Sequence, residues 1–147
     1  MWKRQVAETC KYFSEPPPSL ICSKSELKEI LKRKNWRKFV DANFPNQNKQ
    51  IKIQIRNQMR KALSDLSEIK GSYLSITVDD VTFDMISINN RVFGKPIFPI
   101  TLKHEVAHLI IERQKLLSGK KVKVLEAKVS ELEKLPIEQW DGFFEKK

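Results

Sequence analysis

The only two histidines of the chain stand four residues apart, in the string His104-Glu105-Val106-Ala107-His108. On an α-helix, residues four apart lie on one face, so the two imidazoles can bind a single metal ion. Glu105 directly follows the first histidine and can reach a water molecule held by that ion, where it would act as a general base. The string therefore predicts a zinc active site. The alternative is two ordinary histidines on the surface or in the core of an amphipathic helix.

The residues around this string favour a helix. Thr101 is a candidate N-cap, and Pro96 and Pro99 interrupt the chain just before it. Apolar residues then recur at helical spacing, at Leu102, Val106, Leu109, Ile110, Leu116 and Leu117. The histidines lie beside this apolar stripe, so we expect them to be partly buried.

A catalytic zinc site usually has three protein ligands and one open position. Because the chain has no third histidine, the third ligand must be a carboxylate. The downstream candidates are Glu126, Glu131, Glu133 and Glu138. Residues 122–135 have the apolar spacing of a second helix, on which Glu126 and Glu133 lie along the apolar edge. Glu126 is the favoured ligand and Glu133 the alternative, since Glu131 points away and Glu138 follows Pro136.

The connection between these two helices is the short segment 118–121, which contains Gly119. A short connection predicts antiparallel neighbouring helices and would bring a glutamate back to the histidines. Beyond Pro136, the spacing of Ile137, Trp140, Phe143 and Phe144 predicts a short helix that closes the core.

A β-hairpin is predicted before the histidine-bearing helix. Leu74, Ile76 and Val78 alternate with polar residues, as in a half-buried strand, and Asp79-Asp80 predicts the turn into a partner strand at 81–89. A third short strand is expected near 91–93 or 97–100.

Positive charge is concentrated in the first part of the chain. Residues 1–70 contain 16 Lys and Arg against 7 Asp and Glu, whereas residues 71–147 contain 12 against 11. Two basic helices are predicted, at about 23–40, where Ser23 and Glu26 fit a capping box, and at about 48–66. Direct nucleic-acid binding through basic residues 24–61 is considered but not favoured, because the segment contains no known nucleic-acid motif. A lysine-rich surface in contact with solvent is preferred.

The composition is typical of a globular protein of one domain, covering residues 1–147. Hydrophobic residues make up 40% of the chain and charged residues 31%. No apolar run is long enough to span a membrane, and the N-terminus lacks the apolar stretch of a signal peptide, so a cytoplasmic location without membrane contact is expected. Cys10 and Cys22 are expected to be two buried thiols.

The chain resembles the ImmA/IrrE family of zinc metallopeptidases over about residues 72–136. Ile100–Leu109 is similar to the family's F-T-L-x-H-E-x-G-H helix, and Asp84–Asn89 stands where the family has a strand. Glu126-Ala127 and the later Glu131-Leu132 and Leu135-Pro136 are similar to the family's next helix. The chain has Ala107 in place of the family's usual glycine and a shorter interval between His108 and Glu126. Two alternatives therefore stay open: a reduced or viral variant of the family, and a different small peptidase with two histidines and one glutamate.

The resemblance implies that Glu126 is the third zinc ligand, that Glu105 is the catalytic base and that the fold is gluzincin-like. It also implies a substrate among repressor-type DNA-binding proteins. The expected fold class is α+β, a small zincin-like domain. In it, a short three-stranded sheet packs on the helix of His104 and His108 and on the glutamate-bearing helix, and two basic helices precede the sheet.

The expected activity is that of a zinc-dependent endopeptidase of restricted specificity acting on a protein or peptide. Zinc would polarise the scissile carbonyl, and a second donor would stabilise the oxyanion. Tyr73, Tyr12 and Arg91 are the candidate donors, and Tyr73 is preferred over Tyr12 because it lies within the matched region. Two alternatives stay open: a non-catalytic module that keeps the peptidase fold and sequesters a partner, and a basic protein that associates with nucleic acid.

Overall fold

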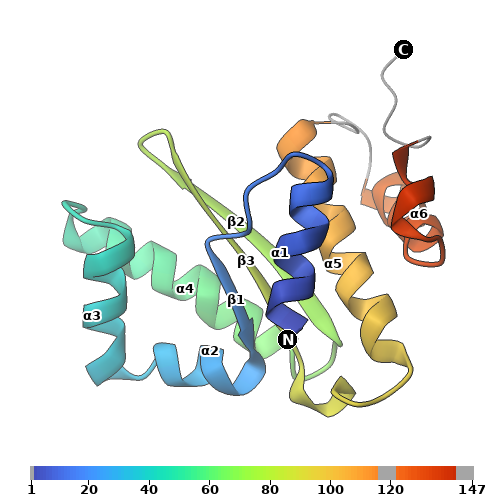
Figure 1. The fold of residues 1–147 in the computed structure, drawn as a ribbon. Helices are drawn as coiled ribbons and strands as arrows, with labels where there is room; N and C mark the ends of the chain where they lie inside the picture. Colours follow the sequence, from blue (N-terminus) through green and yellow to red (C-terminus); the bar gives the residue numbers. More distant parts are fainter. Residues whose placement is uncertain (1, 116–121, 142–147) are drawn as a thin grey trace. The chain divides into compact units, whose positions relative to one another are not determined.

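A computed structural model describes residues 2–115 and 122–141 of the chain and has an α+β fold (Figure 1). The described part divides into two compact units, one formed by residues of 1–19 and 94–147 and the other by residues 20–93. The chain passes from one unit to the other after residues 19 and 93, and not near Gly71, where the excess of positive charge ends. The basic helices and the predicted hairpin therefore belong to the same unit. The expectation of a single domain over 1–147 stays a prediction.

The unit of residues 20–93 contains a three-stranded sheet with the strand order β1-β3-β2 (Figure 1). β2 (Gly71–Val78) and β3 (Val81–Ile88) form the antiparallel hairpin that the sequence predicts. Asp79 and Asp80 connect them with φ angles of 49° and 68°, as in a two-residue hairpin turn whose twist matches that of the strands. β1 (Leu20–Ser23) pairs in parallel with β3, with Leu20 opposite Met85 and Ser23 opposite Ile88.

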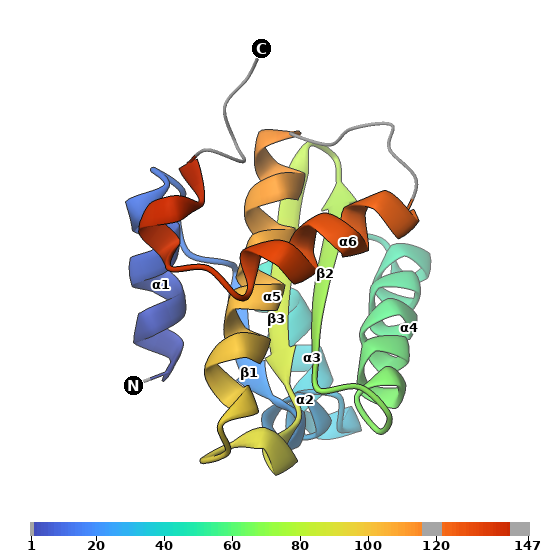
Figure 2. The same cartoon turned by 90° about the vertical axis from the view of Figure 1, so that its right-hand side faces the viewer.

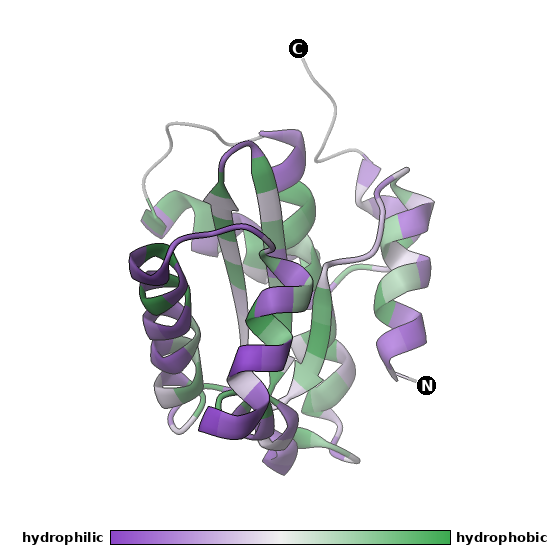
Figure 3. Cartoon of the chain, turned by 90° about the vertical axis from the view of Figure 1, so that its left-hand side faces the viewer, coloured by the Kyte–Doolittle hydropathy of each residue, from purple (hydrophilic) through white to green (hydrophobic). Residues whose placement is uncertain are grey.

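Three helices complete this unit: α2 (Lys24–Ile30), α3 (Arg33–Asn43) and α4 (Lys49–Asp65). They share one hydrophobic core with the sheet, which includes Leu27, Trp36, Val40, Ile55, Met59, Phe83 and Met85. Their outward residues are largely hydrophilic, as the purple segments of Figure 3 show. The second basic helix begins as predicted at Asn48, whose Oδ1 accepts a hydrogen bond from the backbone N–H of Ile51 at 2.9 Å.

The prediction of one helix over 23–40 is wrong, because α2 and α3 are separate. The predicted capping box at the start of α2 is confirmed: Ser23 Oγ accepts from the Glu26 N–H, and Glu26 Oε1 accepts from the Ser23 N–H. Lys32 then adopts an extended conformation with ψ of 141° and starts α3 in a new direction. The turn buries Leu31, which is 6% exposed, in the shared core. The burial of Leu31 in the tertiary structure outweighs the local preference for one continuous helix.

The other unit contains α1 (Trp2–Tyr12), α5 (Ile97–Gln114) and α6 (Val122–Leu132), with both α1 and α6 packed against α5. α6 crosses α5 at a steep angle (Figure 2), so the prediction of antiparallel neighbours is wrong although the two helices are neighbours. The connecting segment 118–121, on which that prediction depended, lies outside the described residues. The 18 residues of α5 carry the histidine string.

The segment after α6 closes the core of this unit, as predicted. A short 3-10 helix, η2 (Ile137–Gln139), leads to Trp140, which is fully buried. The Trp140 indole donates its Nε1–H to the Leu132 carbonyl at 2.8 Å and stacks on Phe13 at 5.6 Å between ring centroids. Phe143 and Phe144 lie outside the described residues.

Two further predictions about the chain before the histidines are wrong. Residues 90–92 form a 3-10 helix, η1 (Asn90–Val92), and residues 97–100 are the first turn of α5, so neither is the third strand, which is β1. Thr101 is not an N-cap but lies inside α5, where its Oγ1 donates to the Ile97 carbonyl at 2.9 Å. Pro99 is accommodated because backbone N–H groups in the first turn of a helix have no acceptor within the helix.

Both cysteines are buried thiols, as predicted. The prediction that the sheet packs on the histidine-bearing helix is a statement about the two units together and stays a prediction. Among the described residues, no helix is both long and apolar enough to cross a membrane.

Candidate metal centre

α5 places the two histidines one helical turn apart at the edge of its buried face. Leu102, Val106, Leu109 and Ile110 are all buried, which confirms the predicted apolar stripe over its described residues. The side chains of His104 and His108 are 26% and 15% exposed, and their ring centroids are 5.0 Å apart. The predicted partial burial is therefore confirmed.

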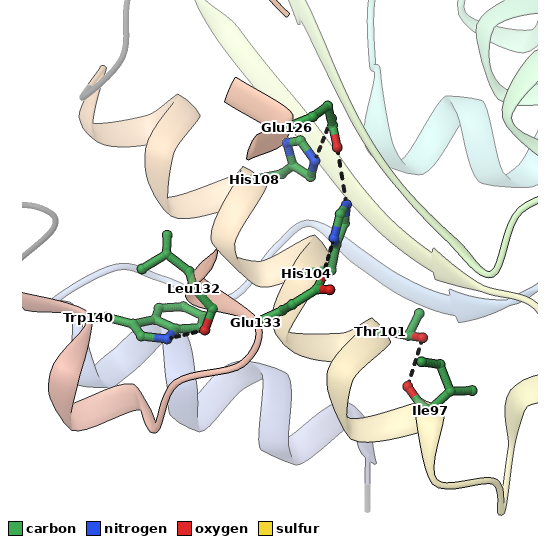
Figure 4. A network of polar contacts seen from close by, with 8 residues as sticks. All are labelled: Ile97, Thr101, His104, His108, Glu126, Leu132, Glu133 and Trp140. Carbon is green, nitrogen blue, oxygen red and sulfur yellow. Dashed lines mark hydrogen bonds and ion pairs between the residues drawn. The ribbon is translucent and has the colours of Figure 1, made fainter. Parts of the chain in front are cut away.

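The Glu126 carboxylate of α6 contacts both imidazole rings (Figure 4). Its Oε2 is 3.0 Å from His108 Nε2, and its Oε1 is 3.4 Å from His104 Nε2. One ligand atom from each of the three residues can be chosen so that all lie within 4.8 Å of one another. Among the described residues, this is the group of histidine and carboxylate side chains that could hold a metal ion.

The donor set fits a divalent metal. Two imidazole nitrogens and one carboxylate form the ligand triad of zinc sites that keep an open coordination position. The Glu126 side chain is 48% exposed, so the carboxylate stands on the solvent side of the group, where a water molecule can complete the coordination.

Buried contacts hold α6 in this place. Val129 and Leu132, three and six residues after Glu126, are fully buried and anchor the helix. The Lys103 ammonium donates to the Leu135 carbonyl at 3.0 Å and fastens the end of this segment to α5. The position of the carboxylate thus depends on the packing of α6, and not on the glutamate alone.

Glu133 contacts the opposite side of the His104 ring. Its Oε2 lies 2.5 Å from His104 Nδ1, and the carboxylate is only 17% exposed (Figure 4). A carboxylate at this place can accept an Nδ1–H, and in that tautomer the lone pair of Nε2 is free to bind a metal ion. Glu133, the alternative ligand predicted from the sequence, is thus brought to the nitrogen of His104 that faces away from Glu126.

Glu131 and Glu138 lie outside the metal-binding group, as the sequence predicts. Glu131 is exposed and lies 3.7 Å from Lys128 Nζ, and Glu138 is exposed in η2 beyond Pro136. The sequence did not predict the contact of Glu133 with Nδ1, although one signal was present: Glu126 and Glu133 are seven residues apart, which places them on one helical face two turns apart.

Glu105 is buried, with 5% of its surface exposed. Burial raises the pKa of its carboxyl to about 8, and the nearby carboxylates of Glu126 and Glu133 act on this pKa in the same direction. Burial also lowers the pKa of His108, while the Glu126 carboxylate opposes this shift and the neighbouring His104 adds to it. Burial is the largest cause of both shifts, and a divalent cation would offset the repulsion between the carboxylates.

Tyr73, the predicted oxyanion donor, lies on β2 opposite Ile86, in the unit of residues 20–93. It is not a member of the group formed by His104, His108 and Glu126, and its role stays a prediction.

Comparisons of the chain with protein-family models, with curated proteins and with solved structures find no match. The function must therefore be inferred from the residues of the site and their chemistry.

Proposed function

We propose that the chain is a zinc-dependent endopeptidase of restricted specificity. In this proposal His104, His108 and Glu126 hold the zinc ion and Glu105 is the general base. The observation that supports it most strongly is the position of the Glu126 carboxylate, within 3.4 Å of the Nε2 atoms of both histidines. A helix-borne pair of histidines and a glutamate from a second helix form the ligand arrangement of two-His-one-Glu peptidases.

Zinc, when bound, supplies a Lewis acid that lowers the pKa of water and polarises a peptide carbonyl. Glu105 would take the proton from that water molecule at one carboxylate oxygen and deliver it to the leaving amine. Its burial suits this role, because a carboxylate with little solvation binds a proton more strongly than an exposed one. Glu126 and Glu133 lie close enough to raise the Glu105 pKa, which is consistent with a side chain directed toward the metal position.

Glu133 would keep the His104 ring in the tautomer that the metal requires. Lys103 supports this indirectly, because its hydrogen bond to the Leu135 carbonyl holds the chain just beyond Glu133. Neither residue is proposed to touch the substrate.

The proposed class is that of gluzincin-like peptidases with the ImmA/IrrE type of motif, and the proposed substrate is a protein such as a repressor-type DNA-binding protein. The string His104–His108 and the glutamate on the following helix support this class. A partner-sequestering module with the same fold would have the same metal group but would not cleave its partner.

The test replaces Glu105 by Gln and compares this variant with Glu112→Gln, a change at an exposed glutamate of the same helix. Zinc content would be measured by atomic absorption, and cleavage would be followed on a library of fluorescence-quenched peptides. We expect one zinc equivalent in all three proteins, and cleavage by wild type and Glu112→Gln only.

Zinc binding without cleavage by the wild-type protein would favour the sequestering module. A wild-type protein that binds no zinc, or a Glu105→Gln variant as active as wild type, would refute the proposed mechanism.

A further inference from the structure

A groove of about 550 Å³ lies between α3 and α4, within the unit of residues 20–93. It has no part in the metal centre, and its residues come from the basic segment whose charge the proposed peptidase activity does not explain. Its chemistry therefore requires a separate account.

The floor of the groove is apolar. Trp36 and Val40 of α3 are buried there, whereas Ile53 of α4 is 50% exposed at the same groove. A half-exposed isoleucine beside buried apolar residues provides an apolar surface on which a side chain of another molecule can pack. The Arg56 guanidinium lies over the Trp36 ring at 5.8 Å from its centroid, so that ring is covered from this direction.

The walls of the groove are basic. Five cationic side chains line it, and they come from both helices: Arg37, Lys49, Lys52, Arg56 and Arg60. The one acidic side chain among the lining residues, Asp41, is already paired with Lys52 at 2.9 Å. The groove thus keeps a surplus of positive charge around its apolar floor.

The guanidinium of Arg56 has one hydrogen-bond donor without an acceptor among the described residues. One of its terminal nitrogens donates to the Leu31 carbonyl at 2.6 Å, but its Nε is buried and has no acceptor among the described residues. Burial lowers the pKa of Arg56, and the nearby Arg60 and Arg33 lower it further. A carboxylate or phosphate in the groove would relieve this repulsion.

Two classes of anion fit a basic groove, and the apolar floor distinguishes them. Nucleic acids are bound by contacts to phosphates and by base stacking on aromatic faces. Here the lining aromatic residue, Trp36, is only 9% exposed, and the exposed apolar residue is Ile53, which offers no stacking surface. An amphipathic protein segment uses both features, because its apolar side chains enter a groove while its charged side chains meet the walls.

We propose that the groove between α3 and α4 binds an acidic amphipathic segment of a partner protein. An apolar side chain of that segment would pack on Ile53, and its carboxylates would pair with Arg37, Lys49 and Arg60. The cationic residues of α4 extend over about eleven positions, so the matching segment is about 16 Å long, or roughly three helical turns. This proposal goes beyond the peptidase activity and does not depend on metal binding.

The test uses the whole 147-residue chain and a fluorescein-labelled peptide of about three helical turns that has glutamates on one helical face and leucines on the other. A second peptide has serine in place of each leucine, and a labelled single-stranded oligonucleotide and a labelled DNA duplex are measured alongside. Fluorescence anisotropy at about 0.15 M salt, where long-range attraction between exposed charges is largely screened, gives each affinity.

Ile53→Ser and Arg60→Ala are the groove variants. Their matched controls are Ile69→Ser, at an isoleucine that is 42% exposed outside the groove, and Lys34→Ala, at an exposed lysine outside it. We expect the leucine peptide to bind more tightly than the serine peptide, and each groove variant to weaken its binding roughly tenfold, as for an interface anchor. The controls should change the affinity by less than about twofold.

Thermal melting of each variant would test whether the fold is retained. The proposal is overturned if no peptide binds, if the two peptides bind equally, or if the controls weaken binding as much as the groove variants. Tighter binding of the oligonucleotide or the duplex, unaffected by Ile53→Ser, would also overturn it and assign the basic residues to nucleic acid.

Discussion

Replacing Glu133 by Ala should weaken zinc binding without removing a zinc ligand. In the structure the Glu133 carboxylate contacts the Nδ1 side of His104, at 2.5 Å, while Glu126 lies on the Nε2 side. The variant would leave all three proposed ligands in place. It would, however, release the His104 ring to rotate and to adopt the other tautomer.

The size of the effect follows from this geometry. The contact is short, and Glu133 is only 17% exposed, so solvent screens it weakly. Loss of a carboxylate that orients a metal-bound histidine usually lowers metal affinity about 10- to 100-fold. We therefore expect a loss of about 30-fold for Glu133→Ala, which corresponds to about 2 kcal/mol. Glu133→Gln should lose less, since the amide oxygen can still accept the Nδ1–H.

The assay is competition for zinc against a chromophoric chelator at one fixed pH for all variants, because metal affinity depends on pH. Glu131→Ala is the matched control, because Glu131 is an exposed glutamate on the same helix, 3.7 Å from the Lys128 ammonium and outside the metal-binding group. Circular dichroism would show whether the overall helical content is unchanged in each variant. The expected order of zinc affinity is wild type and Glu131→Ala first, then Glu133→Gln, then Glu133→Ala.

Glu126→Ala should bind zinc most weakly of all. If Glu133→Ala lost as much affinity as Glu126→Ala, or more, the assignment of ligand and orienting residue would be reversed. If it bound zinc as tightly as Glu131→Ala, the contact with His104 would have no role in metal binding.

Three further predictions concern the ligand, the base and the packing of α6. Glu126→Ala should retain well under one equivalent of zinc after dialysis, measured by atomic absorption, and a full equivalent would place the third ligand elsewhere. In the metal-free protein, the Glu105 pKa of about 8 lies above its ordinary value of 4.5, so the folded state binds the extra proton. The free energy of unfolding should therefore fall as the pH rises from about 5 to 8, by at most about 1.4 kcal/mol per pH unit. Glu105→Gln should flatten this dependence in urea titrations with chelator at several pH values, whereas an equally steep dependence in the variant would show that another group is its source. Leu132 is fully buried, so Leu132→Ala should lower the free energy of unfolding by about 3 kcal/mol. Val124 is 48% exposed, so the control Val124→Ala should lower it by less than about 0.5 kcal/mol. Urea denaturation measures both values.

The features that the sequence predicts well are those set by neighbours along the chain. The capping box of Ser23 and Glu26 needs only four residues, and the turn at Asp79 and Asp80 needs only two between alternating strands. The spacing of His104 and His108 is likewise fixed by one turn of helix. In each case the determining contact lies within the segment itself, so the local pattern carries the information.

The features that the sequence did not predict depend on distant residues. β1 has only four residues, and its partners are Met85–Ile88, more than sixty positions away. The break between α2 and α3 contains neither proline nor glycine, and it forms because Leu31 is buried in a core shared with the strands. The steep crossing of α5 and α6 (Figure 2) likewise reflects packing that a linker length does not determine.

The candidate metal centre lies between these two cases, and α6 shows why. Glu126, Val129 and Glu133 follow one another at intervals of three and four residues, so they share one face of the helix. The middle residue of the three is fully buried against the rest of its unit, while the outer two contact opposite nitrogens of His104. One helical face therefore supplies the candidate ligand, the anchor and the orienting carboxylate. A shift by a single residue would turn a side chain about 100° away from that face, and Lys134, which follows Glu133, is indeed exposed. The period of the helix thus limits the choice to Glu126 and Glu133, and only the packing of α6 against α5 assigns a different nitrogen to each.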